Sequence, residues 1–140
     1  MENPIHIIEV GPRDGLQNET VSLPISVKVQ FIDMLACTGV SEIEAGAFVS
    51  PMQVPQLADT EDVLARIDRK PQVVYSALVP NRRGLERAIE AGIDKVSVFT
   101  SASETFNHKN INTSIEGSIR RFESVLAEAH AAGLPVRVIS

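Results

Sequence analysis

The stretch Ala91-Gly92-Ile93-Asp94-Lys95-Val96-Ser97-Val98-Phe99 reads as a helix end, a glycine, an apolar residue and then a short strand. The same order returns at Thr38-Gly39-Val40 and at Ala132-Gly133-Leu134. Glycine readily adopts the left-handed conformation that ends a helix. The repeat therefore predicts three helices that stop at these glycines, each followed directly by a strand.

Hydrophobic periodicity extends this pattern along the whole chain. Apolar runs predict strands at 5–10, 41–45, 73–78, 95–99 and 135–139, and 3.6-residue spacing predicts helices over about 22–39, 59–71, 81–92 and 113–133. The last helix is predicted to open with a capping box formed by Thr113 and Glu116. Strands that alternate with helices pair in parallel through right-handed crossovers, which leaves an open doubly wound sheet or a (βα)₈ barrel.

The barrel is favoured because the sequence has no G-x-G-x-x-G after its first strand and no P-loop. Four βα units plus a fifth strand make little more than half of a barrel, which typically needs about 250 residues. The predicted fold class is therefore α/β, with 1–140 as the N-terminal portion of a single TIM-barrel catalytic domain that is truncated at its C-terminal end. The alternative is a chain that pairs with another copy to cover its open strand edges.

Composition limits the classes of function. The chain has 140 residues, is 44% hydrophobic and carries a net charge of −5, which describes a globular protein and argues against non-specific nucleic-acid binding. No apolar run is long enough to span a bilayer. One cysteine, Cys37, excludes an internal disulfide. With a strand predicted from residue 5, no room is left for a leader peptide, and the expected compartment is the cytoplasm.

Strand alternation places four charged side chains on the inner face of the predicted barrel. They lie opposite the apolar residues of their strands: Glu9, Glu42, Glu44 and Arg137. Glu9 and Glu44 fall near the C-terminal ends of their strands, where barrel enzymes build active sites. A structural ion-pair network between Arg137 and the glutamates explains the same pattern equally well.

The segment after the first strand carries the densest chemistry: Glu9-Val10-Gly11-Pro12-Arg13-Asp14-Gly15-Leu16-Gln17-Asn18-Glu19. Two glycines bracket an adjacent arginine and aspartate in a predicted loop. A carboxylate there suits a hard divalent cation, and the neighbouring guanidinium suits a developing enolate or a carboxylate. The alternative is a loop salt bridge, or a turn capped by Asp14.

This segment resembles the opening motif of the 3-hydroxy-3-methylglutaryl-CoA lyase family. Further matches follow in the family's order, at Ile43-Glu44, 48–51 with 54–56, 109–112 and 114–116. An Arg-Asp-Gly stretch after the first strand also occurs in isopropylmalate and homocitrate synthases and in the pyruvate carboxylase transferase domain. The residues on either side of that stretch, 9–12 and 16–19, are what single out the lyase.

The resemblance implies a metal-dependent barrel lyase of leucine degradation and ketone-body metabolism that splits 3-hydroxy-3-methylglutaryl-CoA into acetyl-CoA and acetoacetate. By position, Asp14 would bind Mg²⁺ or Mn²⁺, and Arg13 would neutralise the thioester oxygen as the enolate forms. Glu44 and Glu9 would line the catalytic site. The residues implied in substrate binding are Arg13, Gln17, Lys109, Asn110 and Arg137.

The resemblance also implies parts that these 140 residues lack. The family uses a cysteine on a later glycine-rich loop and a His-x-His pair on a later strand, so the chain by itself is expected to be inactive. The expected partner is a small acyl-CoA, in an assembly of identical chains such as a dimer. Two rivals remain: an acyl-CoA condensing synthase of the same barrel class, and a non-catalytic half-barrel module.

Overall fold

A computed structural model describes residues 3–140 of the chain. Five strands are formed: β1 (Ile8–Glu9), β2 (Glu42–Ala47), β3 (Val74–Leu78), β4 (Lys95–Phe99) and β5 (Val136–Ile139). The helices are α1 (Ile25–Ala36), α2 (Thr60–Arg66), α3 (Arg82–Glu90), α4 (Glu104–Ile111) and α5 (Ile115–Ala131). Two short turns complete the list, the π-helical turn η1 (Gly11–Gly15) and the 3₁₀ turn η2 (Pro55–Leu57).

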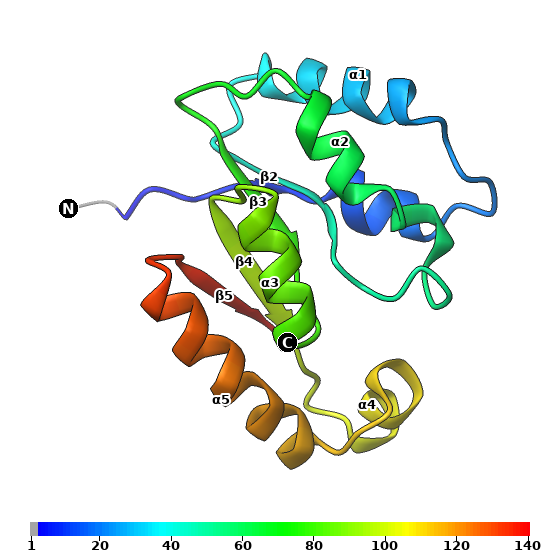
Figure 1. Ribbon diagram of the computed structural model, residues 1–140, viewed down its shortest axis with the longest axis vertical. Helices are drawn as coiled ribbons and strands as arrows, with labels where there is room; N and C mark the ends of the chain where they lie inside the picture. Colours follow the sequence, from blue (N-terminus) through cyan, green and yellow to red (C-terminus); the bar gives the residue numbers. More distant parts are fainter. Residues whose placement is uncertain (1–2) are drawn as a thin grey trace.

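The strands form one parallel sheet in the order β1-β2-β3-β4-β5 (Figure 1). A doubly wound sheet reverses its order at a switch point, whereas each strand of a (βα)₈ barrel lies beside the next one in sequence. The unbroken order therefore decides between the two predicted architectures, and the sheet is a curled half-barrel. The α/β barrel prediction is confirmed.

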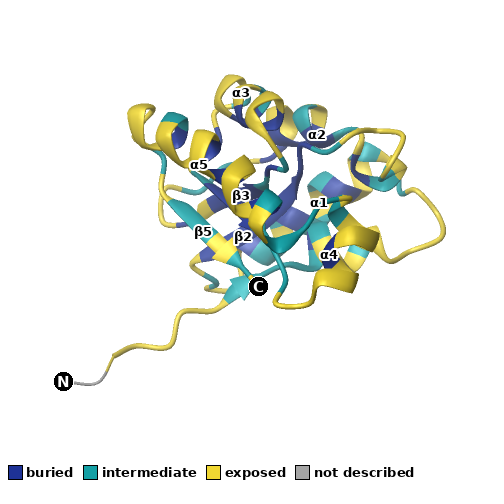
Figure 2. Ribbon diagram, turned by 90° about the horizontal axis from the view of Figure 1, so that it is seen from below, coloured by how far each residue is buried: buried dark blue, intermediate teal, exposed yellow. Residues whose placement is uncertain are grey.

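The hydrophobic core lies between the outer face of the sheet and the helices, seen as the dark interior in Figure 2. Apolar residues of β2, β3 and β4 pack there against the buried faces of α1, α2, α3 and α5. The sheet contributes Ile43, Tyr75 and Val96 to this core, and the helices contribute Ile32, Leu64, Leu85 and Val125. The inner face of the sheet is left to the alternate residues, whose polar members are Glu42, Glu44, Ser76, Lys95, Ser97 and Arg137.

The three repeated glycines end helices as the sequence predicts. Gly39, Gly92 and Gly133 have φ angles of 89°, 70° and 72°, in the left-handed region that disfavours side chains. Each glycine stands between a helix and the strand that follows it, so the repeat in the sequence is a repeat of βα units. Among residues 3–140, no helix combines the length and the apolar character needed to cross a membrane.

Three predicted boundaries are wrong. Helix α2 ends at Arg66 and does not continue to residue 71, because Ile67 is already in an extended conformation. The first strand is only Ile8–Glu9, because pairing with β2 covers just these two residues and residues 3–7 are exposed. The last helix has no capping box: Ser114 is the N-cap and accepts a hydrogen bond from Gly117 N at 3.0 Å, while Glu116 pairs with Arg120.

The sequence prediction also missed helix α4. Residues 104–111 were predicted as loop because they lack an apolar stripe at helical spacing. The helix forms from local bonding instead, since the Ser103 hydroxyl accepts a hydrogen bond from Phe106 N at 3.3 Å. Asn112 ends it in the left-handed conformation, with φ of 50°.

Candidate active site

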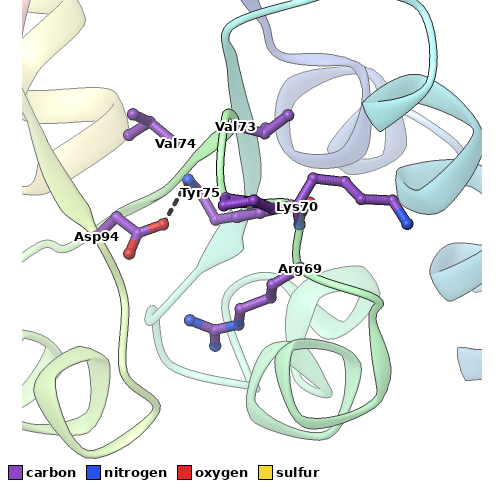
Figure 3. Close-up of a pocket in the computed structure, with 7 residues that line it drawn as sticks. Arg69, Lys70, Val73, Val74, Tyr75 and Asp94 are labelled. Atoms are coloured by element: carbon purple, nitrogen blue, oxygen red, sulfur yellow. Dashed lines mark hydrogen bonds between the residues drawn. The ribbon is translucent and has the colours of Figure 1, made fainter.

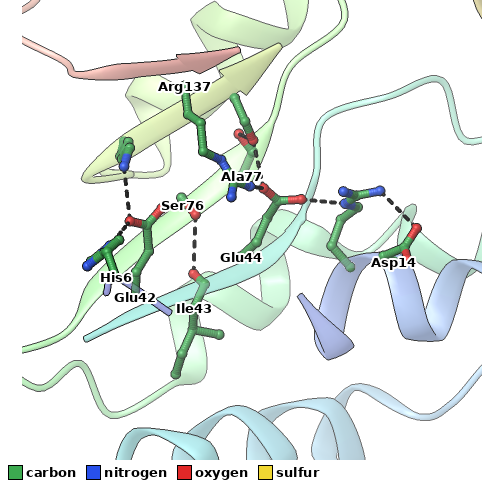
Figure 4. A network of polar contacts seen from close by, with 11 residues as sticks. His6, Asp14, Glu42, Ile43, Glu44, Ser76, Ala77 and Arg137 are labelled. Carbon is green, nitrogen blue, oxygen red and sulfur yellow. Dashed lines mark hydrogen bonds and ion pairs between the residues drawn. The ribbon is translucent and has the colours of Figure 1, made fainter. Parts of the chain in front are cut away.

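Polar side chains on the inner face of the sheet form two groups at different positions along the strands (Figure 4). One group surrounds Glu42 at the N-terminal ends of the strands, and the other surrounds Glu44 nearer the C-terminal ends. The two glutamates are two residues apart on β2, so both lie on the inner face of the half-barrel, whereas Ile43 between them faces the helices. Both are buried, at 1% and 0% exposure.

Glu44 gathers three donors on its carboxylate. Arg13 Nε binds Oε1, Arg137 Nη2 binds Oε2, and Ser97 Oγ donates to Oε2 at 2.8 Å. The sheet register brings Ser97 and Arg137 together, because Ser97 pairs with Arg137 on β5 and with Leu78 on β3. Strand β3 in turn pairs with β2, which carries Glu44. Two guanidinium groups that come from distant parts of the chain thus share one buried anion.

Arg13 and Asp14 lie in η1, where a helical turn replaces the predicted loop. The backbone N–H groups of both residues donate to Val10 O, at 3.1 and 2.7 Å. Arg13 is largely enclosed, with 13% of its side chain exposed, whereas Asp14 is 55% exposed. Arg13 Nη1 also donates to Asp14 Oδ1 at 3.2 Å. The turn therefore holds a guanidinium fixed by Glu44 beside a carboxylate that is open to solvent.

Glu9 is not brought into this group, although strand alternation predicted that it would be. Its Oε1 accepts a hydrogen bond from Gly11 N at 2.8 Å, next to the ring of Phe31 on α1. The register of β1 is the cause: Glu9 pairs with Ile43, which faces the helices, so Glu9 lies on the helix-facing side of the sheet and Ile8, beside Glu42, takes the inner face. Within residues 3–140 no hydrogen bond or ion pair links Glu9 to Glu44 or to Arg137.

The other predicted substrate-binding residues are exposed. Gln17 follows η1, and Lys109 and Asn110 lie at the end of α4. Asn110 Nδ2 donates to Phe106 O at 2.9 Å within that helix. These segments follow the C-terminal ends of β1 and β4, so they lie on the same side of the sheet as Arg13. In the described part of the chain, none of the three bonds to the Glu44 group.

Ser97 and Lys95 are members of the two groups that the sequence reasoning did not single out. Lys95 Nζ and His6 Nε2 each lie 3.0 Å from Glu42 Oε2, and Ser41 Oγ lies 3.2 Å from His6 Nδ1. Alternation along β4 could have indicated both residues, because it turns Val96 and Val98 to the core and Lys95 and Ser97 inward. Their partners Glu42 and Glu44 lie on β2, and only the order of the strands shows that they meet.

The charged neighbours of Glu42 make stability depend on acid pH. Burial opposes ionisation, but the hydrogen bonds from His6 and Lys95 and the charge of Lys95 outweigh it and hold the pKa of Glu42 below 4.5. Because the folded-state pKa lies below the unfolded value, this stabilisation is complete above about pH 4.5 and is lost as pH falls through the folded pKa.

We expect Glu42→Gln to flatten that part of the acid-unfolding profile. Free energies of unfolding measured in urea from pH 6 to pH 2.5 would reveal the difference. Glu116→Gln, at an exposed helix position paired with Arg120, is the matched control and should retain the wild-type slope. An acid slope in Glu42→Gln equal to that of the wild type would contradict this assignment.

A hollow in the surface lies at the opposite end of the sheet from Arg13. It is lined by residues at and just before the N-terminal ends of β3 and β4, among them Arg69, Lys70, Tyr75 and Asp94 (Figure 3). Their polar groups serve the fold: Arg69 Nη2 donates to Ala91 O at 2.8 Å at the end of α3, and Tyr75 N donates to Asp94 Oδ2 at 2.9 Å. Barrel enzymes place chemistry at the other end of their strands, so we assign no site to this hollow.

Metal binding would need more ligands than this region supplies. Between residues 3 and 140 no cluster of three or more His, Cys, Asp or Glu side chains is arranged to hold an ion. Asp14 fits the role of a single ligand, since its carboxylate is exposed and lies at the C-terminal end of β1. Glu44 does not fit it, because its oxygens are already occupied by Arg13, Arg137 and Ser97.

Five parallel strands in sequential order, with charged side chains gathered toward their C-terminal ends, form a half-barrel of the (βα)₈-barrel class. A family model described as HMGL-like matches residues 4–140. The chain belongs to the HMGL-like family.

Two relatives and two solved structures illustrate the similarity. The chain is 51% identical to the mitochondrial hydroxymethylglutaryl-CoA lyase of Gallus gallus and 53% identical to the cytoplasmic 3-hydroxy-3-methylglutaryl-CoA lyase of Danio rerio, over 95% of its own length. The HMG-CoA lyase of Brucella melitensis superposes with a TM-score of 0.94 at 46% identity, over 96% of this chain.

The second structure, an HMG-CoA lyase from Acenitobacter baumannii in complex with coenzyme A and 3-methylmalate, gives a TM-score of 0.89 at 36% identity over 95% of this chain. The chain spans 45% and 40% of the two relatives, and 47% and 44% of the two structures. It therefore corresponds to less than half of each.

Proposed function

We propose that the protein containing this chain cleaves 3-hydroxy-3-methylglutaryl-CoA to acetyl-CoA and acetoacetate, a step of leucine degradation and ketone-body metabolism. The observation that carries the proposal is the pairing in η1: Arg13 is fixed by buried Glu44, and Asp14 beside it is open to solvent. The names of the relatives at about 50% identity support the same reaction. We further propose that residues 1–140 form the first four βα units and fifth strand of one catalytic barrel domain.

Arg13 would act on the charge that bond cleavage releases. When the carbon–carbon bond breaks, its electron pair passes into the acetyl thioester and makes an enolate, while the tertiary hydroxyl gives its proton to a general base and becomes the ketone of acetoacetate. Protonation of the enolate carbon then completes acetyl-CoA. A guanidinium beside the thioester oxygen stabilises this enolate more than the substrate, which lowers the barrier. Glu44 would keep the guanidinium in place, because its carboxylate binds both Arg13 and Arg137.

Asp14 would supply one ligand to a divalent cation, Mg²⁺ or Mn²⁺. Such an ion, when bound, acidifies a coordinated hydroxyl and polarises a carbonyl. The remaining ligands and the general base would come from parts of the relatives' length that this chain does not span. Asp14 contributes a carboxylate whose Oδ1 accepts a hydrogen bond from Arg13 and whose side chain stays 55% exposed.

The other predicted residues have supporting positions. Gln17, Lys109 and Asn110 would contact the acyl-CoA from the segments after β1 and β4, and the solved lyase that holds coenzyme A supports such a ligand. Glu9 would act only through the η1 backbone that it caps.

We propose an assembly of identical chains such as a dimer. We also propose a cytoplasmic location, which suits the exposed thiol of Cys37, although relatives are named both cytoplasmic and mitochondrial.

The test is a cleavage assay on the complete natural polypeptide that contains this chain, with acetoacetate measured before and after EDTA. We expect chelation to abolish turnover and added Mg²⁺ or Mn²⁺ to restore it. Asp14→Asn should raise the metal concentration for half-maximal activity at least about tenfold. Turnover that survives EDTA, or condensation of a 2-oxo acid with acetyl-CoA in place of cleavage, would contradict the proposal.

A further inference from the structure

Lys28 is a buried charge on α1 that the proposed chemistry does not use. Its side chain is 5% exposed, and Nζ binds Gln56 O and lies 2.7 Å from Asp59 Oδ1. A lysine is rarely enclosed in this way unless its charge is paired and hydrogen-bonded, because desolvation costs several kcal/mol. Both partners of Lys28 lie in the connection between β2 and α2, so the lysine ties that connection to α1.

Gln56 carries the link onward to the connection after β1. Its Nε2 donates to Glu19 O at 2.8 Å, a few residues beyond the turn that holds Arg13 and Asp14. Residue 56 thus accepts from Lys28 with its backbone carbonyl and donates to Glu19 with its side-chain amide. The segments that follow the C-terminal ends of β1 and β2 are joined through this one residue.

We propose that Lys28 and Gln56 are positioning residues that hold the Arg13–Asp14 turn in its working orientation. The proposal rests on the function proposed above. We call the chain of contacts from Asp59 and Lys28 through Gln56 to Glu19 the brace. It joins two active-site connections to each other and lies outside the helix–sheet core, so its role is to set the place of η1 relative to Glu44 on β2.

The geometry separates this role from general stability. Arg13 must reach Glu44, which lies 31 residues away on the next strand, and a bond from its Nε joins the two residues. Its other bond, from Nη1, goes to Asp14 within the same turn. A small shift of η1 against β2 would misplace the groups that meet the reacting atoms, and displacements of about 1 Å can cost about 10²-fold in rate. Binding of the bulk of an acyl-CoA would be affected much less.

The experiment compares Gln56→Ala, Gln56→Glu and Lys28→Met with the wild type of the complete polypeptide. Gln56→Glu keeps the shape but removes the N–H donor, so it should behave like Gln56→Ala. For both, we expect kcat to fall about tenfold with KM for the acyl-CoA within about twofold and the unfolding midpoint unchanged. Lys28→Met should lower kcat as well, and Lys28→Arg should restore most of it.

The control is Lys70→Met, which removes a partly exposed lysine paired with Asp68 at the opposite end of the sheet and should leave kcat unchanged. A second readout does not depend on activity. Hydrogen exchange over residues 10–24 should be faster in Gln56→Ala by about fivefold or more, and exchange over α5 should not change.

These readouts distinguish the two proposals. A wild type without turnover would refute the proposed function, and exchange would still test the brace. Wild-type kcat in the Gln56 variants, or unchanged exchange over residues 10–24, would overturn the brace. A loss of kcat that is matched by a lower unfolding midpoint would assign Lys28 and Gln56 to stability alone.

Discussion

Replacement of Arg13 by glutamine should lower kcat for acyl-CoA cleavage by about 10²–10³-fold in the complete polypeptide. The guanidinium is enclosed, is held by Glu44, and lies beside the exposed carboxylate of Asp14. Glutamine keeps an N–H donor on a shorter side chain but has no positive charge to balance an enolate. Removal of a single preorganised donor to a developing oxyanion commonly costs this much. Steady-state rates at saturating substrate and metal would measure the loss.

Arg82→Gln is the matched control for this change. Arg82 lies on α3, is 67% exposed and pairs with Glu86 and Glu128, so its loss should leave kcat within about twofold. Arg13→Lys should fall between the wild type and Arg13→Gln, because it keeps the charge without the planar fork that binds Glu44. If Arg13→Gln turned over at the wild-type rate, the assigned role of the guanidinium would be wrong.

Glu44→Ala should lower the free energy of unfolding by about 3 kcal/mol or more. The carboxylate is fully buried and is the shared partner of Arg13, Arg137 and Ser97. Without it, two guanidinium groups face each other in a partly desolvated space with no anion between them. Removal of one partner from a buried ion pair typically costs about 3–5 kcal/mol. The partial exposure of both arginines puts the expected value toward the lower limit.

Urea unfolding at pH 7 would measure this loss. Glu44→Gln should cost less, because the amide oxygen still accepts from one donor while the positive charges remain unbalanced. Glu116→Ala, which removes an exposed partner of Arg120, should cost less than about 1 kcal/mol. Similar losses for Glu44→Ala and Glu116→Ala would contradict the central position that we give to Glu44.

Much of the fold could be predicted because local signals and global topology agree. Gly39, Gly92 and Gly133 mark helix ends by their backbone conformation alone. Strand order was not readable from any single segment, since both parallel architectures share the same alternation of elements. The absence of nucleotide-binding motifs favoured the barrel, and the sequential pairing of the strands confirmed it.

The site could be predicted only where strand alternation holds. Arg137 lies in a regular strand and Glu44 lies just before a register shift in β2, so the inward direction of both followed from a period of two. On β1 the two faces were assigned the wrong way round, because Glu9 pairs with core-facing Ile43, and this register could not be read from the sequence. Ser97 and Lys28 gain their importance from partners 53 and 31 residues away, and such pairings require the tertiary structure.

The span of the Glu44 contacts has a consequence for the order of folding. Neighbouring strands are also neighbours in sequence, so the sheet can grow by short loop closures that cost little entropy. The ion pair between Glu44 and Arg137 instead closes 93 residues, across every crossover in between. We therefore expect the paired sheet to precede the charge cluster, and a nascent chain would hold Glu44 without its second cation until β5 has docked.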